Sequence, residues 1–205
     1  MSKVGLILLA AGCAQRMGFS KQLLPLDGVP MLYRAVNSAI SSSSYPIIVV
    51  TGANSELIDE SINKLPITIV HNPDWNMGIG TSIKTGINAM STLDVDATII
   101  TLSDQPLLSS ATFDRLIESY QKSSCDIAAS EYEGTLGTPA LFDRSLFQTL
   151  LNLSPHEGCK KIIMCYPQDR VYKCSCPEAA IDIDTPSDYL LLLQKYTLEL
   201  ESTSK

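Results

Sequence analysis

A segment near the N-terminus places glycines and two cationic residues directly after an apolar run. LILLAA is followed by GCAQRMGFSK, which contains Gly12, Arg16, Gly18 and Lys21. Glycine lets a ligand approach the backbone and permits turns that a side chain would obstruct. Arginine grips phosphate oxygens through paired hydrogen bonds, and lysine supplies a compact positive charge. We interpret the segment as a loop that holds a nucleoside triphosphate. Its spacing is neither that of a Walker P-loop nor G-x-G-x-x-G, so an ordinary surface loop is the alternative.

Three aspartates are candidate ligands for Mg2+. Asp104 follows the apolar run ATIITLS and precedes Pro106, which cannot extend a strand. Asp182 and Asp184 are two residues apart, so both side chains would point to one face of the strand predicted there. Like charges at this spacing are unfavourable without a cation, and carboxylate oxygens suit Mg2+ bound together with nucleotide phosphates. A loop or helix-capping role for Asp104, and solvent exposure for the pair, are the alternatives.

A second glycine-containing loop, NMGIGTSIKTG, opens a predicted helix. Exposed backbone N–H groups at a helix start can bind a phosphate or the edge of a base. Ser82 could contact a base there or merely cap the helix. Trp75, the single tryptophan, could cover a substrate pocket or pack in the core.

The elements that would position these residues alternate along the chain. Short apolar runs predict strands, and helical periodicity predicts the segments between them. The predicted strands are residues 4–9, 46–52, 66–72, 96–104, 125–131, 139–143 and 179–184. The predicted helices are residues 30–40, 55–64, 80–90, 109–120, 146–153, 158–165 and 186–196.

This alternation predicts an α/β fold with a mostly parallel sheet covered on both faces. Ligands bind beyond the carboxyl ends of the strands in such sheets, and the three candidate motifs follow predicted strands. We expect one domain over residues 1–198 and a frayed tail over residues 199–205.

Composition narrows the classes of function and partner. The net charge of -7 over 205 residues argues against a nucleic-acid partner. Six cysteines form no C-x-x-C pair, and the chain has only two histidines, so we expect reduced thiols in a cytoplasmic protein without a zinc site. No run is long enough to span a membrane. LLAAGC is similar to a lipoprotein cleavage box, but cleavage there would remove the first predicted strand.

Recognisable motifs extend over nearly the whole chain. LAAGCAQRMGFSKQLLPLDGVPML resembles the signature of the MobA-like nucleotidyltransferases, L-A-[AG]-G-x-S-x-R-M-G-x-x-K, with Ala14 where serine is usual. The resemblance continues in NPDWNMGIGTSIKTGI, SDQPLL, GTPALFDRSLF and DIDTPSDYLLL. It implies a Rossmann-like nucleotide-diphospho-sugar transferase fold of the GT-A type, a three-layer sandwich.

The resemblance also implies roles for residues. Arg16 and Lys21 would stabilise the triphosphate and, with Asp104, form the catalytic set. Asp104 would be the principal Mg2+ ligand, with Asp184 preferred over Asp182 as the second. The implied nucleotide-binding residues are Leu9, Ala10, Ala11, Gly12, Gly18, Gly78, Gly80 and Ser82.

The same family suggests the reaction. Its members include enzymes that attach CMP or GMP to molybdopterin. LAAG is typical of the cytidylyl branch and LAGG of the guanylyl branch, and a methyl group at Ala11 would crowd a purine more than a pyrimidine. We therefore expect Mg2+-dependent transfer of CMP from CTP to a molybdopterin-type acceptor, with release of pyrophosphate and a molybdenum hydroxylase as a partner.

Several alternatives stay open. The chain could use GTP, or it could be a cytidylyltransferase of the methylerythritol-phosphate type, a sugar-phosphate nucleotidyltransferase, or a non-catalytic carrier of molybdenum cofactor. Thr138 and the segment HEGCKKII depart from the family pattern on the acceptor side, which leaves the acceptor's identity open.

Overall fold

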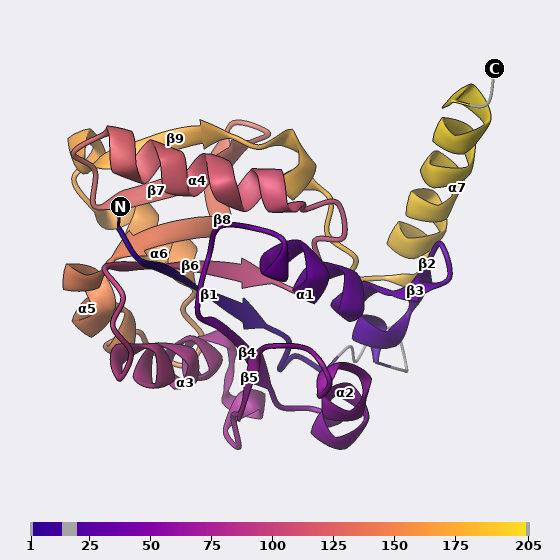
Figure 1. Ribbon diagram of the computed structural model, residues 1–205, viewed down its shortest axis with the longest axis horizontal. Coiled ribbons are helices and arrows are strands. Elements are labelled where there is room, and N and C mark those ends of the chain that lie inside the picture. The colour runs from indigo at the N-terminus through magenta and orange to yellow at the C-terminus, as the bar shows by residue number, and fades with distance from the viewer. Residues whose placement is uncertain (1, 14–19, 204–205) are drawn as a thin grey trace.

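The computed structural model describes residues 2–13 and 20–203 and shows a central sheet between two layers of helices (Figure 1). Seven strands form the sheet in the spatial order β5-β4-β1-β6-β8-β7-β9, and β2 pairs with β3 in a separate hairpin. The strands are β1 (Val4–Leu9), β2 (Pro25–Leu26), β3 (Val29–Pro30), β4 (Ile47–Thr51), β5 (Thr68–His71), β6 (Ala97–Leu102), β7 (Ile127–Tyr132), β8 (Thr135–Asp143) and β9 (Val171–Ser175).

Most neighbouring strands run in the same direction. β1 pairs in parallel with β4 and β6, β4 with β5, and β7 with β9. In the seven-stranded sheet β8 alone runs against its neighbours β6 and β7. The predicted mostly parallel α/β sheet is confirmed.

The helices cover both faces of this sheet. They are α1 (Met31–Ile40), α2 (Ser55–Ile62), α3 (Ile79–Ser91), α4 (Ser110–Lys122), α5 (Phe147–Leu151), α6 (Cys159–Cys165) and α7 (Pro186–Thr203). Side chains of α1, α2 and α4 belong to one buried cluster, and side chains of α3, α5 and α6 belong to another. The sheet lies between the two clusters, so the predicted three-layer sandwich is confirmed.

The position of β1 inside the sheet explains why its sequence is apolar throughout. Leu6 and Leu8 of β1 pack into the cluster under α1, α2 and α4, while Ile7 and Leu9 pack into the cluster under α3. Because both faces are covered, alternate side chains are equally buried. Each such aliphatic side chain contributes about 1.5–3 kcal/mol when it leaves water.

The strand order creates a switch point at β1. The chain passes from β1 to β4 and β5 on one side, and then returns to place β6 on the other side of β1. Loops that leave the carboxyl ends of two such strands diverge and open a crevice between them. The Ser103 N–H donates to the Leu9 carbonyl oxygen at 3.1 Å and holds the two strand ends side by side.

The predicted strand at residues 179–184 is wrong. Pro177–Ala180 forms a short 3-10 helix, and residues 181–184 have no regular structure. Ile183 is fully buried in a small cluster with Leu26, Met31 and Leu192. The alternation of apolar and acidic residues therefore arises from packing against α1 and α7, and only one backbone bond, from the Ile183 N–H to the Asp104 carbonyl at 3.0 Å, ties the segment to the end of β6.

Two hairpins and an edge strand were not predicted. Asp27 and Gly28 connect β2 to β3 with φ of 55° and 74°, and Glu133 and Gly134 connect β7 to β8 with φ of 48° and 72°. Two-residue turns with positive φ match the twist of paired antiparallel strands. The other differences are β9, and α7, which runs to Thr203 rather than ending at Tyr196.

Helix α7 extends away from the sandwich (Figure 1). Its first turns are held by the packing of Leu192 and by a hydrogen bond from the Tyr189 hydroxyl to the Pro25 carbonyl. None of the described helices is long and apolar enough to cross a bilayer.

Close contact between α3 and the sheet depends on Gly86. A Cβ atom there would lie 2.6 Å from Cγ2 of Ile7 and 3.2 Å from Cγ2 of Val50. We expect Gly86→Ala to lower the free energy of unfolding by about 1–2 kcal/mol, because overpacking outweighs the better helix propensity of alanine. Urea denaturation measures this value. The control is Asn88→Ala on the exposed side of the same helix, which we expect to be neutral or slightly stabilising. Equal stabilisation by both substitutions would contradict the packing argument.

Candidate active site

A cavity of about 300 Å³ lies at the carboxyl ends of β1 and β6. That volume is at the lower end of small-molecule sites, which commonly lie at this switch point. Its walls come from the loop after β1, the 3-10 helix Lys21–Leu23, the start of α3 and the residues after β6. They are Leu9, Ala11, Gly12, Cys13, Lys21, Gln22, Trp75, Gly78, Ile79, Ser82, Leu102, Ser103 and Asp104.

Lys21 joins two of the predicted carboxylates. Its Nζ donates to Oδ2 of Asp104 at 2.8 Å and to Oδ1 of Asp184 at 2.9 Å. Only 12% of the lysine side chain is exposed, against 21% for Asp104 and 53% for Asp184. Three segments far apart in the sequence therefore converge on one ammonium group.

The charges around Lys21 keep it protonated. Burial works against the charged form, but the attraction of Asp104 and the hydrogen bonds to Asp104 and Asp184 outweigh it, so the pKa of Lys21 is raised. The ammonium group is thus a permanent positive charge in the wall of the cavity, suited to an anionic ligand.

Asp182 lies close to the same carboxylates without accepting a hydrogen bond from Lys21. Burial, then the negative charges of Asp184 and Asp104, raise the pKa of Asp182. The expectation that Asp182 and Asp184 would point to one face of a strand fails because the strand is absent. The two carboxyl groups are nevertheless near enough to repel each other.

The site has donor atoms suited to Mg2+ without forming a complete protein cage. Oδ1 of Asp104 is buried and has no hydrogen-bond partner in the described part of the chain, so this hard oxygen is a candidate metal ligand. Among the described residues, no group of three or more His, Cys, Asp or Glu side chains is arranged to hold a metal ion. Mg2+ is usually held by one or two carboxylates and completed by substrate phosphates and water. The residues present fit that mode of binding.

The loop at the start of α3 is shaped by contact with the segment 154–157. Gly78 has φ of 125°, and a Cβ atom on it would lie 2.5 Å from the Pro155 carbonyl oxygen. The Gly80 N–H donates to the same oxygen at 2.8 Å, so it is not available to a ligand. Gly78 lines the cavity, whereas Gly80 packs behind it.

Ser82 is held in place by a neighbour from the end of β5. The buried Asn72 side chain donates to the Ser82 Oγ at 2.9 Å. Among the described residues the hydroxyl hydrogen of Ser82 has no acceptor. Ser82 lines the cavity and can therefore donate to a ligand, as its predicted role requires.

The loop after β1 contributes several predicted residues. Leu9, Ala11 and Gly12 line the cavity, and Ala10 is buried beside it. Arg16 and Gly18, predicted to contact the triphosphate, lie outside the described residues.

Two buried glutamines were missed by the sequence analysis. Nε2 of Gln22 donates to the carbonyl oxygens of Ala10 and Gly12, and Nε2 of Gln105 donates to those of Thr138 and Ala179. Each follows a predicted site residue, Lys21 or Asp104. That adjacency was the signal available in the sequence.

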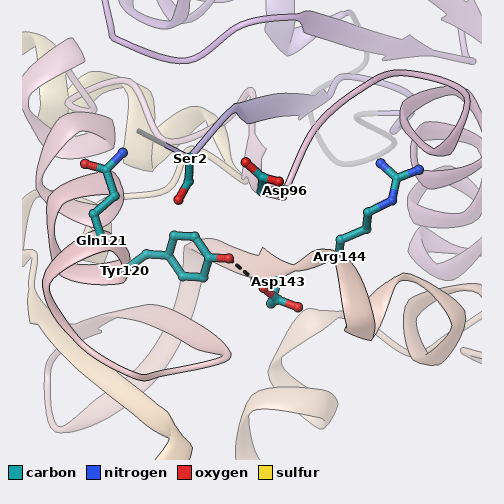
Figure 2. Close-up of a pocket in the computed structure, with 6 residues that line it drawn as sticks. All are labelled: Ser2, Asp96, Tyr120, Gln121, Asp143 and Arg144. Carbon is teal, nitrogen blue, oxygen red and sulfur yellow. Dashed lines mark hydrogen bonds between the residues drawn. The ribbon is translucent and has the colours of Figure 1, made fainter.

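A larger hollow, of about 780 Å³, lies at the opposite end of the central strands, beside the residues that precede β1 and β6 (Figure 2). There the Tyr120 hydroxyl donates to Asp143 at 2.5 Å, and this contact, after burial, raises the pKa of Tyr120. Arg144 points away to donate to the carbonyl oxygens of Ser91, Leu93 and Val95. These groups already have protein partners, and the hollow lies away from the strand ends where this fold binds ligands. We therefore assign the site to the smaller cavity.

Residues 6–171 match the model of the MobA-like NTP transferase domain. The chain belongs to this family. The fold and the family implied by the sequence motifs are confirmed.

The chain is similar to other proteins over much of its length. It is 28% identical over 197 residues to the molybdenum cofactor cytidylyltransferase of Escherichia coli K12, covering 96% of this chain and 99% of that protein. It is 34% identical over 124 residues, 60% of each chain, to nicotine blue oxidoreductase of Paenarthrobacter nicotinovorans. A solved structure from Mycobacterium tuberculosis, in complex with manganese, has a TM-score of 0.76 at 23% identity and covers 95% of this chain and 99% of that one.

Asp182 and Asp184 should differ in their effect on the stability of this MobA-like chain. At pH 7 without divalent cations, we expect Asp182→Asn to raise the free energy of unfolding by about 0.5 kcal/mol or less, since Asp182 is exposed to solvent. A raised pKa means that the folded protein favours the protonated carboxyl, and this advantage is lost as the pH rises through the folded pKa. The gain should vanish below the ordinary pKa of 3.8.

Asp184→Asn is the matched substitution. It removes a negative charge that forms an ion pair with Lys21, so we expect no stabilisation at pH 7. Urea denaturation at pH 7 and pH 3 measures both variants, and a gain for Asp184→Asn equal to that for Asp182→Asn would contradict the assigned contacts.

Proposed function

We propose that this protein is a Mg2+-dependent cytidylyltransferase that transfers CMP from CTP to a molybdopterin-type acceptor and releases pyrophosphate. The observation that carries the proposal is the buried Lys21 ammonium group between Asp104 and Asp184, at the mouth of a cavity lined by backbone of the loop after β1. The relationship to the molybdenum cofactor cytidylyltransferase of Escherichia coli supports the choice of nucleotide and acceptor.

The reaction needs a phosphate oxygen of the acceptor to attack the α-phosphorus of CTP. A bond forms between that oxygen and the α-phosphorus, and the bond from the α-phosphorus to the bridging oxygen of the β-phosphate breaks. Pyrophosphate leaves with the electron pair. The chain acts by positioning and by neutralising charge, so it needs no covalent intermediate.

Lys21 has the properties that this task requires. It is protonated, nearly buried and fixed by two carboxylates, so its charge is already oriented when the nucleotide arrives. A preorganised charge in a site with little water stabilises developing negative charge more than a solvated one. We assign Arg16 to the same triphosphate by its place in the family signature.

Asp104 and Asp184 would hold Mg2+, with Asp182 beside them. The buried Oδ1 of Asp104 is the atom best suited to it. When bound, the cation supplies positive charge to phosphate oxygens. A divalent ion is also found in the solved Mycobacterium tuberculosis relative, whose structure was determined with manganese.

We assign the acceptor to the part of the site beside β7, β8 and the segment that carries Asp182 and Asp184. Gln105 ties these parts together through the Thr138 and Ala179 carbonyl oxygens. A molybdopterin-type acceptor would bind here, and the CMP-linked product would pass to a molybdenum hydroxylase. We propose that both steps take place in the cytoplasm.

Asp104→Asn should separate catalysis from folding. We expect turnover of CTP to fall at least about 100-fold, because the substitution removes the charge and keeps the shape. The free energy of unfolding should fall by no more than about 1–2 kcal/mol. Pyrophosphate release with molybdopterin as acceptor measures turnover, and urea denaturation measures stability.

Asp94→Asn is the matched control, since Asp94 is an exposed acid paired with Lys3 far from the cavity. It should keep normal turnover. Near-normal turnover of Asp104→Asn would disprove the role assigned to Asp104, and no pyrophosphate release by the wild type with any nucleotide would favour a carrier.

Ala11→Gly tests the choice of nucleotide. Ala11 lines the cavity, and its Cβ lies beside the backbone of Gly52, so its methyl group would reduce the space for a purine. We expect the substitution to shift relative binding toward GTP by about tenfold, as one methyl group in a pocket commonly does. Calorimetric titration of both nucleotides measures the ratio, and an unchanged ratio would rule out the methyl group as the selector.

A further inference from the structure

Gln22 is a buried amide that contacts the loop after β1 and lines the same cavity. It is 2% exposed and follows Lys21 in the 3-10 helix Lys21–Leu23. Its Nε2 donates to the carbonyl oxygen of Gly12 at 2.9 Å and to that of Ala10 at 3.2 Å. One side chain therefore fixes the direction of two peptide groups in the loop.

Peptide geometry determines where the matching N–H groups point. The C=O and N–H of one trans peptide unit are coplanar and point in opposite directions. Because Gln22 holds the carbonyls of Ala10 and Gly12, the N–H groups of Ala11 and Cys13 are directed away from Gln22. Neither N–H has an acceptor in the described parts of the chain, and both residues line the cavity.

Burying the amide of Gln22 costs free energy, which indicates that the side chain is needed for the two hydrogen bonds that its Nε2 donates. Its Oε1 is buried and has no hydrogen-bond partner among residues 2–13 and 20–203, which is unfavourable for a polar atom. A methionine of similar length would fill the same space without an unpaired acceptor. What methionine cannot do is hold two carbonyl oxygens away from a bound anion.

We propose that Gln22 is a positioning residue that turns the backbone of the loop after β1 into a binding site for a polyphosphate. It keeps the carbonyl oxygens of Ala10 and Gly12 out of the phosphate's way and presents the N–H groups of Ala11 and Cys13 to it. Ala11 and Cys13 are two residues apart, and backbone N–H groups directed to one side attract anions. This inference rests on the proposed function and assigns Gln22 no direct contact with the reacting atoms.

Gln22→Met tests the proposal with inorganic pyrophosphate and cytidine as separate probes. Titration calorimetry in the presence of Mg2+ measures both affinities for the wild type and the variant. We expect pyrophosphate binding to weaken about tenfold or more, the loss that follows from misdirecting hydrogen bonds to a charged group. Cytidine affinity should stay within about threefold of the wild type, because its base and ribose do not depend on these N–H groups.

Ser44→Ala is the matched control for loss of a buried polar side chain. Ser44 is 4% exposed and hydrogen-bonds to Ser42 before β4, away from the cavity. It should leave both affinities unchanged. If Gln22→Met does not fold, Gln22→Leu removes the same two donors without adding a charge, and the same selective loss of pyrophosphate binding is expected.

The outcomes separate the inference from the proposed function. Normal pyrophosphate binding by the wild type with equal binding by both Gln22 variants would overturn the inference alone, as would equal weakening of pyrophosphate and cytidine. Failure of the wild type to bind pyrophosphate would overturn the proposed function and the inference with it.

Discussion

The ion pairs between Lys21 and the two carboxylates of Asp104 and Asp184 are the constraint on which the site depends. Carboxylates gathered at one strand end of a protein with net charge -7 repel each other unless a cation lies between them. Lys21 supplies that cation from a helical turn after β1, and Asp104 and Asp184 come from segments far along the chain. The fold must bring these segments together for the charges to balance.

The sheet does so through its switch point. β1 and β6 are parallel and adjacent, and both are buried on each face, so their carboxyl ends are fixed relative to each other. The Ser103 N–H donates to the Leu9 carbonyl oxygen and holds the two strand ends together. The Ile183 N–H donates to the Asp104 carbonyl oxygen, which connects the segment of residues 181–184 to the end of β6. Rigid strand ends thus carry loops whose side chains and N–H groups do the chemistry.

The sequence predicts the parts of this arrangement that follow from local patterns. Continuous apolar runs place β1 and β6, and the residues after them are candidates because parallel strands share one functional edge. The alternation of isoleucine and aspartate around Asp182 predicts a strand that is absent, because Ile183 is buried against α1 and α7 and not by strand pairing. The turn at Asp27 and Gly28 carried a recognisable hairpin signal.

Other features depend on long-range contacts that no local pattern specifies. The Lys21–Asp184 contact joins residues 163 positions apart, and nothing in either neighbourhood specifies the other. The roles of Gln22 and Gln105 depend on which carbonyl oxygens the folded chain brings within reach. Burial of an amide can be read only from the packed structure.

The most direct test of the account is a calorimetric titration of the wild-type protein with CTP, with and without Mg2+, against GTP. We predict that CTP binds more tightly than GTP and that Mg2+ strengthens its binding, because the carboxylates beside Lys21 share the cation with the triphosphate. CTP binding that is absent, or that does not respond to Mg2+, would contradict the central claim that this cavity holds a metal-bound nucleotide.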